Sequence, residues 1–140
     1  MKRVLLDTSA YTALLTGDQA VFAKLAAAEI VLMSIIVLGE LYAGFRAGSK
    51  EQQNRNRLAS FLAKPSIKIL PATQDTAEFF GVVKDGLRRA GTPIPTNDVW
   101  IAAQALEAGA QLVTYDAHFS KVKGLLLWEG ACVEVRHGAH

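Results

Sequence analysis

The chain has 140 residues, 51% of them hydrophobic, and a formal net charge of +2 at pH 7. This length and composition predict a single domain, residues 1–140, with a sizeable buried core. No apolar run approaches the roughly 18 residues of a membrane-spanning helix, and the chain reaches Asp7 too early for a signal peptide. The single cysteine, Cys132, excludes an internal disulfide, so we expect a cytoplasmic protein without a membrane partner.

The N-terminal half alternates between short apolar runs and segments with helical spacing. Asp18 is expected to cap a helix, while Gly17 and Pro65 each end one. In chain order the predicted elements are a strand at 3–7 ("RVLLD"), helices at 10–17 and 19–29, a strand at 30–34 ("IVLMS"), and helices at 35–48 and 50–64.

The C-terminal half continues the alternation. The predicted elements are a strand at 66–70 ("SIKIL"), a helix at 73–91, a helix at 98–106 that Thr96 or Asn97 can cap, and strands at 110–116 ("AQLVTYD") and 131–136 ("ACVEVR"). Strands separated by helices at this spacing predict right-handed crossovers. The expected fold class is therefore α/β, with a central, mostly parallel sheet covered by helices on both faces.

Four acidic residues occupy positions that such a sheet can bring together. Asp7 and Asp116 each follow a predicted strand, and Glu40 lies in the second turn of the helix after strand 30–34, so these three point to the carboxyl edge of the sheet. Asp98 opens a helix that precedes a strand, and it joins them only if its loop crosses back. Each Asp also has an ordinary explanation, as a turn residue or as a helix-start acid worth about 0.3–1 kcal/mol.

Glu40 is harder to explain as an ordinary surface residue. Its apolar neighbours include Val37, Leu38 and Leu41, so we expect its carboxylate to be partly buried and to need a partner. Two carboxylates about 4 Å apart repel by about 4 kcal/mol at an effective dielectric near 20, which exceeds any helix-dipole benefit. A divalent hard cation such as Mg²⁺ or Mn²⁺ would remove that conflict and could activate water for phosphodiester hydrolysis.

A basic segment accompanies these acids. Residues 46–68 contain six cationic side chains and one acid, Glu51. Such a segment is compatible with a polyanionic partner, although a basic helix is more often a solvated face. The candidates for RNA binding in this segment are Arg46, Arg55 and Arg57.

The residues reached in this way resemble the PIN-domain family, and specifically its VapC-type ribonuclease toxins of toxin–antitoxin systems. "VLLDTSAY" resembles the family's opening strand with its Asp, and "SIIVLGELYAG" resembles the second motif with its Glu. "PIPTNDVWIAAQALEAGAQLVTYDAHF" resembles the third and fourth motifs together and is the most specific part. Each motif alone is weak evidence, whereas four in this order are strong evidence.

The resemblance implies a three-layer α/β/α PIN fold and metal-dependent endonucleolytic cleavage of RNA, with Mg²⁺ or Mn²⁺ as cofactor. It also implies homodimerisation and neutralisation by a cognate antitoxin protein. Carried over residue by residue, it makes Asp7, Glu40, Asp98 and Asp116 the catalytic, metal-binding acids, supported by the hydroxyls of Thr8, Ser9 and Thr114 and by Asn97 beside Asp98.

One position departs from the family pattern. Many relatives carry a further acid two residues after the fourth one, where this chain has His118. A lone histidine is more often structural or solvated, so His118 is left outside the predicted site. Two other functions stay open: a catalytically silent RNA-binding or scaffolding module, and a phosphatase with a strand-end Asp nucleophile. The phosphatase class requires a second Asp two residues after the first, and this chain has Ser9 at that position.

Overall fold

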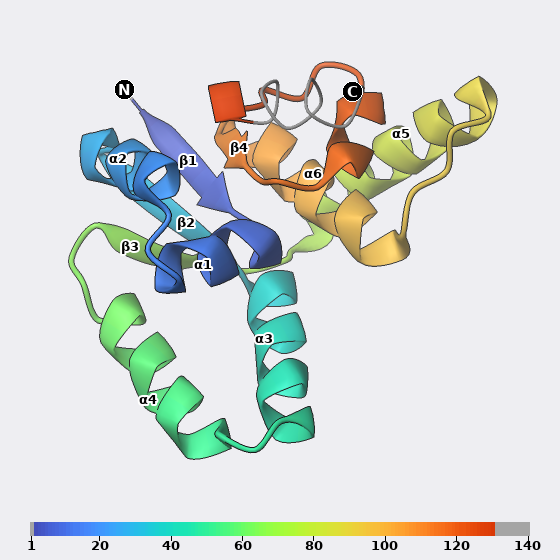
Figure 1. Ribbon diagram of the computed structural model, residues 1–140. Helices are drawn as coiled ribbons and strands as arrows, with labels where there is room; N and C mark the ends of the chain where they lie inside the picture. Colours follow the sequence, from blue (N-terminus) through green and yellow to red (C-terminus); the bar gives the residue numbers. More distant parts are fainter. Residues whose placement is uncertain (1, 131–140) are drawn as a thin grey trace, which may run out of the picture.

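The structure is a computed structural model that describes residues 2–130 (Figure 1). The predicted strand at 131–136 and Cys132 lie outside the described residues. The elements are β1 (Arg3–Leu6), α1 (Thr8–Leu15), α2 (Gln19–Ala27), β2 (Ile30–Ser34), α3 (Ile35–Ala47), α4 (Glu51–Leu62), β3 (Ile67–Leu70), α5 (Gln74–Ala90), α6 (Thr96–Ala108), β4 (Gln111–Val113) and a 3₁₀ helix, η1 (Ala117–Lys121).

The four strands form one parallel sheet in the order β3-β2-β1-β4. This arrangement confirms the predicted α/β class. The chain steps from β1 to β2 to β3 in one direction and then returns past β1 to β4. With right-handed crossovers, α1 and α2 lie over one face of the sheet and α5 and α6 over the other, while α3 and α4 form a hairpin that projects beyond the sheet (Figure 1). The strand order thus reverses between β1 and β4.

Strands β1, β2 and β4 are short and apolar because the sheet is covered on both faces there, whereas the edge strand β3 is exposed at Lys68 and Ile69. In β1, Val4, Leu5 and Leu6 are fully buried, and Leu5 pairs in register with Leu32 of β2 and Leu112 of β4. A polar side chain on either face of such a strand would be buried against a helix. Near-continuous apolar runs are therefore expected here. In the part of the chain that the structure describes, no helix is both long enough and apolar enough to cross a membrane.

Two helices begin earlier than the sequence predicts. Helix α1 begins at Thr8 because Asp7 is its cap: the backbone N–H of Ala10 donates to Asp7 Oδ1 at 2.9 Å. Helix α6 begins at Thr96 after Pro95, and no side chain caps it, so the expectation that Thr96 or Asn97 does so is wrong. Asn97 instead lies inside the first turn of the helix. The predicted cap of α2 by Asp18 is confirmed.

Helix α6 is tied to the carboxyl ends of two strands by one buried amide. Gln104 is fully buried; its side-chain oxygen accepts from the Ser34 hydroxyl at the end of β2, and its nitrogen donates to the carbonyls of Leu70 and Pro71 at the end of β3, both at 3.2 Å. Buried amides are stable only when they are hydrogen-bonded, so these contacts fix where α6 lies. They place the start of α6 at the carboxyl edge of the sheet.

Candidate active site

The candidate site lies at the carboxyl edge, where the strand order reverses between β1 and β4. Asp7 follows β1 directly, and its backbone N–H donates to the carbonyl of Val113, the last residue of β4, at 3.2 Å. The chain then leaves β4 through Thr114 to Asp116. In open parallel sheets this reversal point is where loops and helix starts leave room for a ligand.

Asp7 is the most deeply buried of the candidate acids, with 4% of the residue exposed. Its Oδ1 accepts from Ser9 Oγ at 2.8 Å as well as from Ala10 N, and its Oδ2 accepts from Thr114 Oγ1 at 2.5 Å. Burial raises the pKa of Asp7 above its ordinary value; the hydrogen bonds oppose this rise, while the charge of Asp116 adds to it. Asp7 thus caps α1 and also belongs to a group of interacting acids.

Glu40 reaches the same edge from α3. Its Oε1 accepts from Thr8 Oγ1 at 2.7 Å, and its Oε2 accepts from Asn97 Nδ2 at 3.2 Å. The prediction that Glu40 is partly buried and has a partner is confirmed. Asn97 lies inside the first turn of α6, and its amide N–H holds the Glu40 carboxylate near Asp98.

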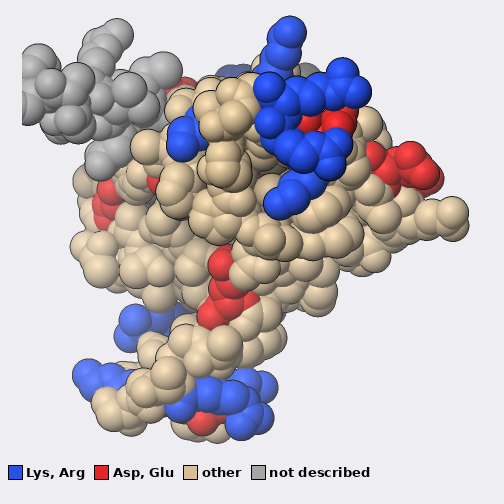
Figure 2. All heavy atoms as spheres, turned by 90° about the vertical axis from the view of Figure 1, so that its right-hand side faces the viewer, with Lys and Arg blue, Asp and Glu red and all other residues tan. Residues whose placement is uncertain are grey.

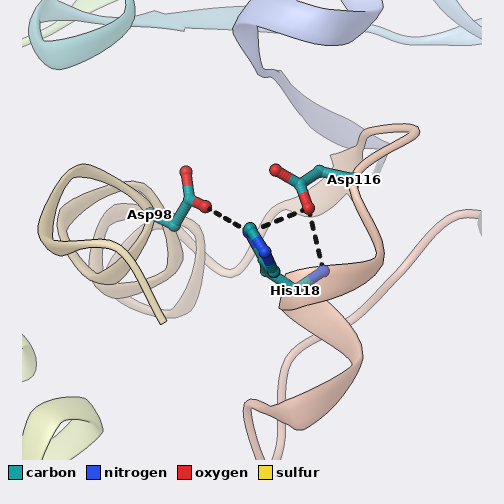
Figure 3. A group of neighbouring side chains, drawn as sticks. All are labelled: Asp98, Asp116 and His118. Atoms are coloured by element: carbon teal, nitrogen blue, oxygen red, sulfur yellow. Dashed lines mark hydrogen bonds and ion pairs between the residues drawn. The ribbon is translucent and has the colours of Figure 1, made fainter. Parts of the chain in front are cut away.

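Asp98, Asp116 and His118 form the tightest cluster of the site (Figure 3). Each offers one ligand atom, and all three atoms lie within 4.8 Å of one another. His118 Nδ1 is 3.1 Å from Asp98 Oδ2 and 3.0 Å from Asp116 Oδ1. Burial raises the pKa of Asp98; the hydrogen bond from His118 opposes the rise, and the charges of Asp116 and Glu40 add to it.

The loop that carries Asp116 is held from several sides. Thr114 Oγ1 accepts from the backbone N–H of Asp116 at 2.9 Å, and Trp128, which is 1% exposed, donates its indole N–H to the Thr114 carbonyl at 2.6 Å. The Tyr115 hydroxyl donates to Asp18 Oδ2 at 2.7 Å. These contacts tie the loop after β4 to the protein core and to the start of α2.

The structure therefore brings all four predicted acids to one edge of the sheet. Their mutual charge effects link Asp7 to Asp116, and Asp116 and Glu40 to Asp98. The four predicted supporting side chains all hydrogen-bond an acid of this group; they are Thr8, Ser9, Asn97 and Thr114. His118, left outside the predicted site, lies between two of these acids. Its spacing of two residues from Asp116 was the signal that could have pointed to it.

The three arginines predicted to bind RNA lie on the hairpin that α3 and α4 form (Figure 1). Arg46 is exposed in the last turn of α3. On α4, the guanidinium of Arg55 lies 4.8 Å from the Tyr42 ring centroid and pairs with Glu51 at 4.0 Å. Arg57 lines a hollow with Leu14, Leu15 and Phe22. Figure 2 shows acidic side chains between two groups of Lys and Arg on one face of the molecule.

The donor set suits a divalent cation. Carboxylate oxygens predominate, and the buried carboxylate of Asp7 and the charges around Asp98 leave a negative site. The other ion pairs in the described part of the chain join Lys24, Arg55, Arg88 and Arg89 to Glu129, Glu51 and Asp85. The cationic partner of the site acids is thus the imidazole of His118, when it is protonated.

Comparisons with known proteins agree with this geometry. The model of the PIN domain family matches residues 4–125. The chain is 29% identical to Ribonuclease VapC5 of Mycobacterium tuberculosis over 85% of this chain and 87% of that protein, and 31% identical to Ribonuclease VapC2 of Rickettsia felis over 74% and 76%. In the crystal structure of VapBC2 from Rickettsia felis, bound to a promoter DNA fragment, one chain superposes with a TM-score of 0.81 at 26% identity, covering 90% of this chain and 97% of that one. The present chain therefore belongs to the PIN domain family.

Proposed function

We propose that this protein is a metal-dependent endoribonuclease and the toxin of a toxin–antitoxin pair. The observation that carries the proposal is the convergence of four carboxylates from separate elements on one edge of the sheet. Such a group costs stability unless a cation balances it, so its retention favours a role in chemistry. The relatives named as VapC ribonucleases, and the neighbour whose chain is part of a VapBC complex, support the reaction class and the antitoxin partner.

In this proposal Asp7, Glu40, Asp98 and Asp116 hold a divalent ion, Mg²⁺ or Mn²⁺. When bound, such an ion supplies an activated water and balances the charge that develops on the phosphate. The chain's own contribution is to orient the ligands: Ser9 and Thr114 hydrogen-bond Asp7, while Thr8 and Asn97 hydrogen-bond Glu40. Ligands held in this way need little reorganisation when substrate arrives.

The basic hairpin of α3 and α4 is proposed to hold the RNA backbone. Arg46 lies on α3, the helix that carries Glu40, and Arg55 and Arg57 lie on the adjoining helix α4. Cationic side chains beside an acidic centre can attract a polyanion that the acids alone would repel. We propose further that the protein is neutralised by an antitoxin protein, which the VapBC2 complex supports. We also propose that it forms a homodimer.

The decisive experiment measures RNA cleavage by the purified chain, followed by sequencing of the new 5′ ends. We expect cleavage with Mg²⁺ or Mn²⁺, none in EDTA, and recovery when the ion is restored, because the acids alone carry the wrong sign for a phosphate. Asp116→Asn should lose cleavage, whereas Asp75→Asn, an exposed acid in the first turn of α5, should keep it. Full cleavage in EDTA would refute the metal requirement, and RNA binding without cleavage under any condition would favour the silent module.

A further inference from the structure

We propose that His118 is a nitrogen ligand of the divalent ion and gives the site a preference for Mn²⁺ over Mg²⁺. The inference rests on the proposed metal-dependent function and adds one residue and one selectivity to it. Its basis is the position of the imidazole, which lies between two carboxylates that come from different elements: Asp98 from the first turn of α6 and Asp116 from the loop before η1 (Figure 3).

The two distances from the imidazole nitrogen to the carboxylate oxygens fit a shared ion, and all three donor atoms lie within 4.8 Å of one another. An octahedral cation with bonds of about 2.1 Å spaces neighbouring ligand atoms about 3.0 Å apart. His118 Nδ1 lies 3.1 Å from Asp98 Oδ2 and 3.0 Å from Asp116 Oδ1. A ring nitrogen carries at most one hydrogen, so it cannot donate a separate bond to each carboxylate. An ion coordinated by all three atoms would instead satisfy both carboxylates together with the nitrogen.

The backbone holds the imidazole in this position. The N–H of His118 donates to Asp116 Oδ1 at 2.9 Å, which makes Asp116 the cap of η1. The next residue, Phe119, is fully buried and fixes η1 against the core. The side chain of His118 is itself 45% exposed, so substrate and water can reach it. A ligand set in which one residue positions the next loses little side-chain freedom on binding an ion.

The chemical consequence concerns which ion is preferred. Mg²⁺ takes oxygen ligands almost exclusively, whereas imidazole nitrogen is a good ligand for transition metals. Replacing one oxygen ligand by a nitrogen therefore favours Mn²⁺, which also accepts the surrounding carboxylates.

The test is electron spin-echo spectroscopy of Mn²⁺ bound to the purified full chain, which detects a directly bound ¹⁴N nucleus. We expect nitrogen modulation in the unaltered protein and none in His118→Ala or His118→Asp. Both variants keep His137 and His140, the other two of the three histidines, so these provide an internal control. Calorimetric titrations should measure the affinities for Mn²⁺ and for Mg²⁺. The ratio of Mn²⁺ affinity to Mg²⁺ affinity should be at least about tenfold higher for the unaltered protein than for His118→Asp.

The outcomes separate this inference from the proposed function. Mn²⁺ bound without nitrogen modulation would overturn the role of His118 and leave the carboxylate site standing. Modulation that persists in His118→Ala would assign the nitrogen to another histidine and overturn the inference equally. Absence of Mn²⁺ binding to the unaltered protein would remove the metal site, and with it the proposed function. Melting curves serve as the control for folding. Both variants are expected to fold, because the side chain of His118 is 45% exposed.

Discussion

Asp7 and Asp98 show how one carboxylate can have both a structural and a chemical explanation. Asp7 caps α1, and Asp98 lies in the first turn of α6, where any acid gains from the helix dipole. Dipole stabilisation alone would favour ionisation. The pKa of each is instead raised, because burial and neighbouring acids oppose the charged form. These two residues are therefore retained at some cost to the stability of the metal-free fold.

Replacing Asp98 separates the two explanations. We expect Asp98→Asn to abolish cleavage and to leave the metal-free protein as stable as before, or more stable by on the order of 1 kcal/mol, because the neighbouring charges of Asp116 and Glu40 are relieved. Asp75→Asn, in the first turn of α5, is the matched control. If Asp98 only stabilises its helix, the variant should keep its activity and lose up to about 1 kcal/mol. Thermal melts in EDTA and cleavage assays in Mn²⁺ decide between these results.

The raised pKa of Asp98 also predicts how stability depends on pH. The folded state holds the proton more tightly than the unfolded state, whose value is near the ordinary 3.8. The contribution of Asp98 to stability is therefore fully present below that value and is lost as pH rises through the pKa of the folded protein. In EDTA, the gain from Asp98→Asn should be largest near neutral pH and vanish in acid. A gain that is independent of pH would contradict the assignment, and denaturant melts across the range measure it.

At the scale of elements, the start of α6 and the loop after β4 assemble the centre of the site. Gln104 holds α6 against the ends of β2 and β3, and Trp128 holds the loop through the Thr114 carbonyl. The hairpin of α3 and α4 carries the basic side chains. Its first helix, α3, also supplies Glu40 from its second turn. Positioning and attraction of substrate are thus divided between elements.

The hairpin can be tested through the salt dependence of RNA binding. The double variant Arg55→Ala and Arg57→Ala should bind single-stranded RNA more weakly and flatten the slope of log affinity against log salt by up to about 1.4, or about 0.7 for each phosphate that is no longer neutralised. The cleavage rate at saturating RNA should stay the same, since neither arginine is one of the residues that are proposed to hold the ion. The matched control replaces Lys2 and Lys24, which line a hollow beside the start of β1. An unchanged slope would show that these two arginines do not contact RNA phosphates and are ordinary solvated side chains.

At the scale of the whole molecule, the site is a property of the complete fold. Its four acids come from the end of β1, from α3, from α6 and from the loop after β4, so no single element contains the donor set. Binding an ion therefore stabilises all of these elements together. The coupling is direct, because a ligand that binds only the folded state stabilises it by an amount that grows with the logarithm of its concentration divided by the dissociation constant.

This coupling predicts a single cooperative unfolding transition that shifts as one when metal is added. At an ion concentration of about 100 times the dissociation constant, the gain should be about 2.7 kcal/mol. Asp98→Asn should gain clearly less. Calorimetry with and without Mn²⁺ measures both quantities. Two separate transitions, of which only one responds to the ion, would contradict the single-domain prediction for residues 1–140.

Local sequence signals were sufficient for the class of fold and for the order of most elements. Apolar runs such as "IVLMS" and the cap at Asp18 depend on neighbours in the chain, so burial and helix ends can be predicted from spacing alone. The motifs around Asp7, Glu40, Asp98 and Asp116 also identified the acids that the fold gathers. The starts of α1 and α6 were less predictable, because Asp7 itself caps α1 and α6 begins after Pro95 with no side-chain cap.

Only the tertiary structure decided which side chains meet. The amide N–H of Asn97 donates to the partly buried carboxylate of Glu40, which is 57 residues away in the chain. His118 could have been solvated, yet the start of α6 brings Asp98 to within 3.1 Å of its ring. Spacing along the sequence carries no information about such long-range pairs, since their distances depend on how α6 crosses the sheet. The sequence by itself determined the residues available for chemistry, and packing determined their geometry.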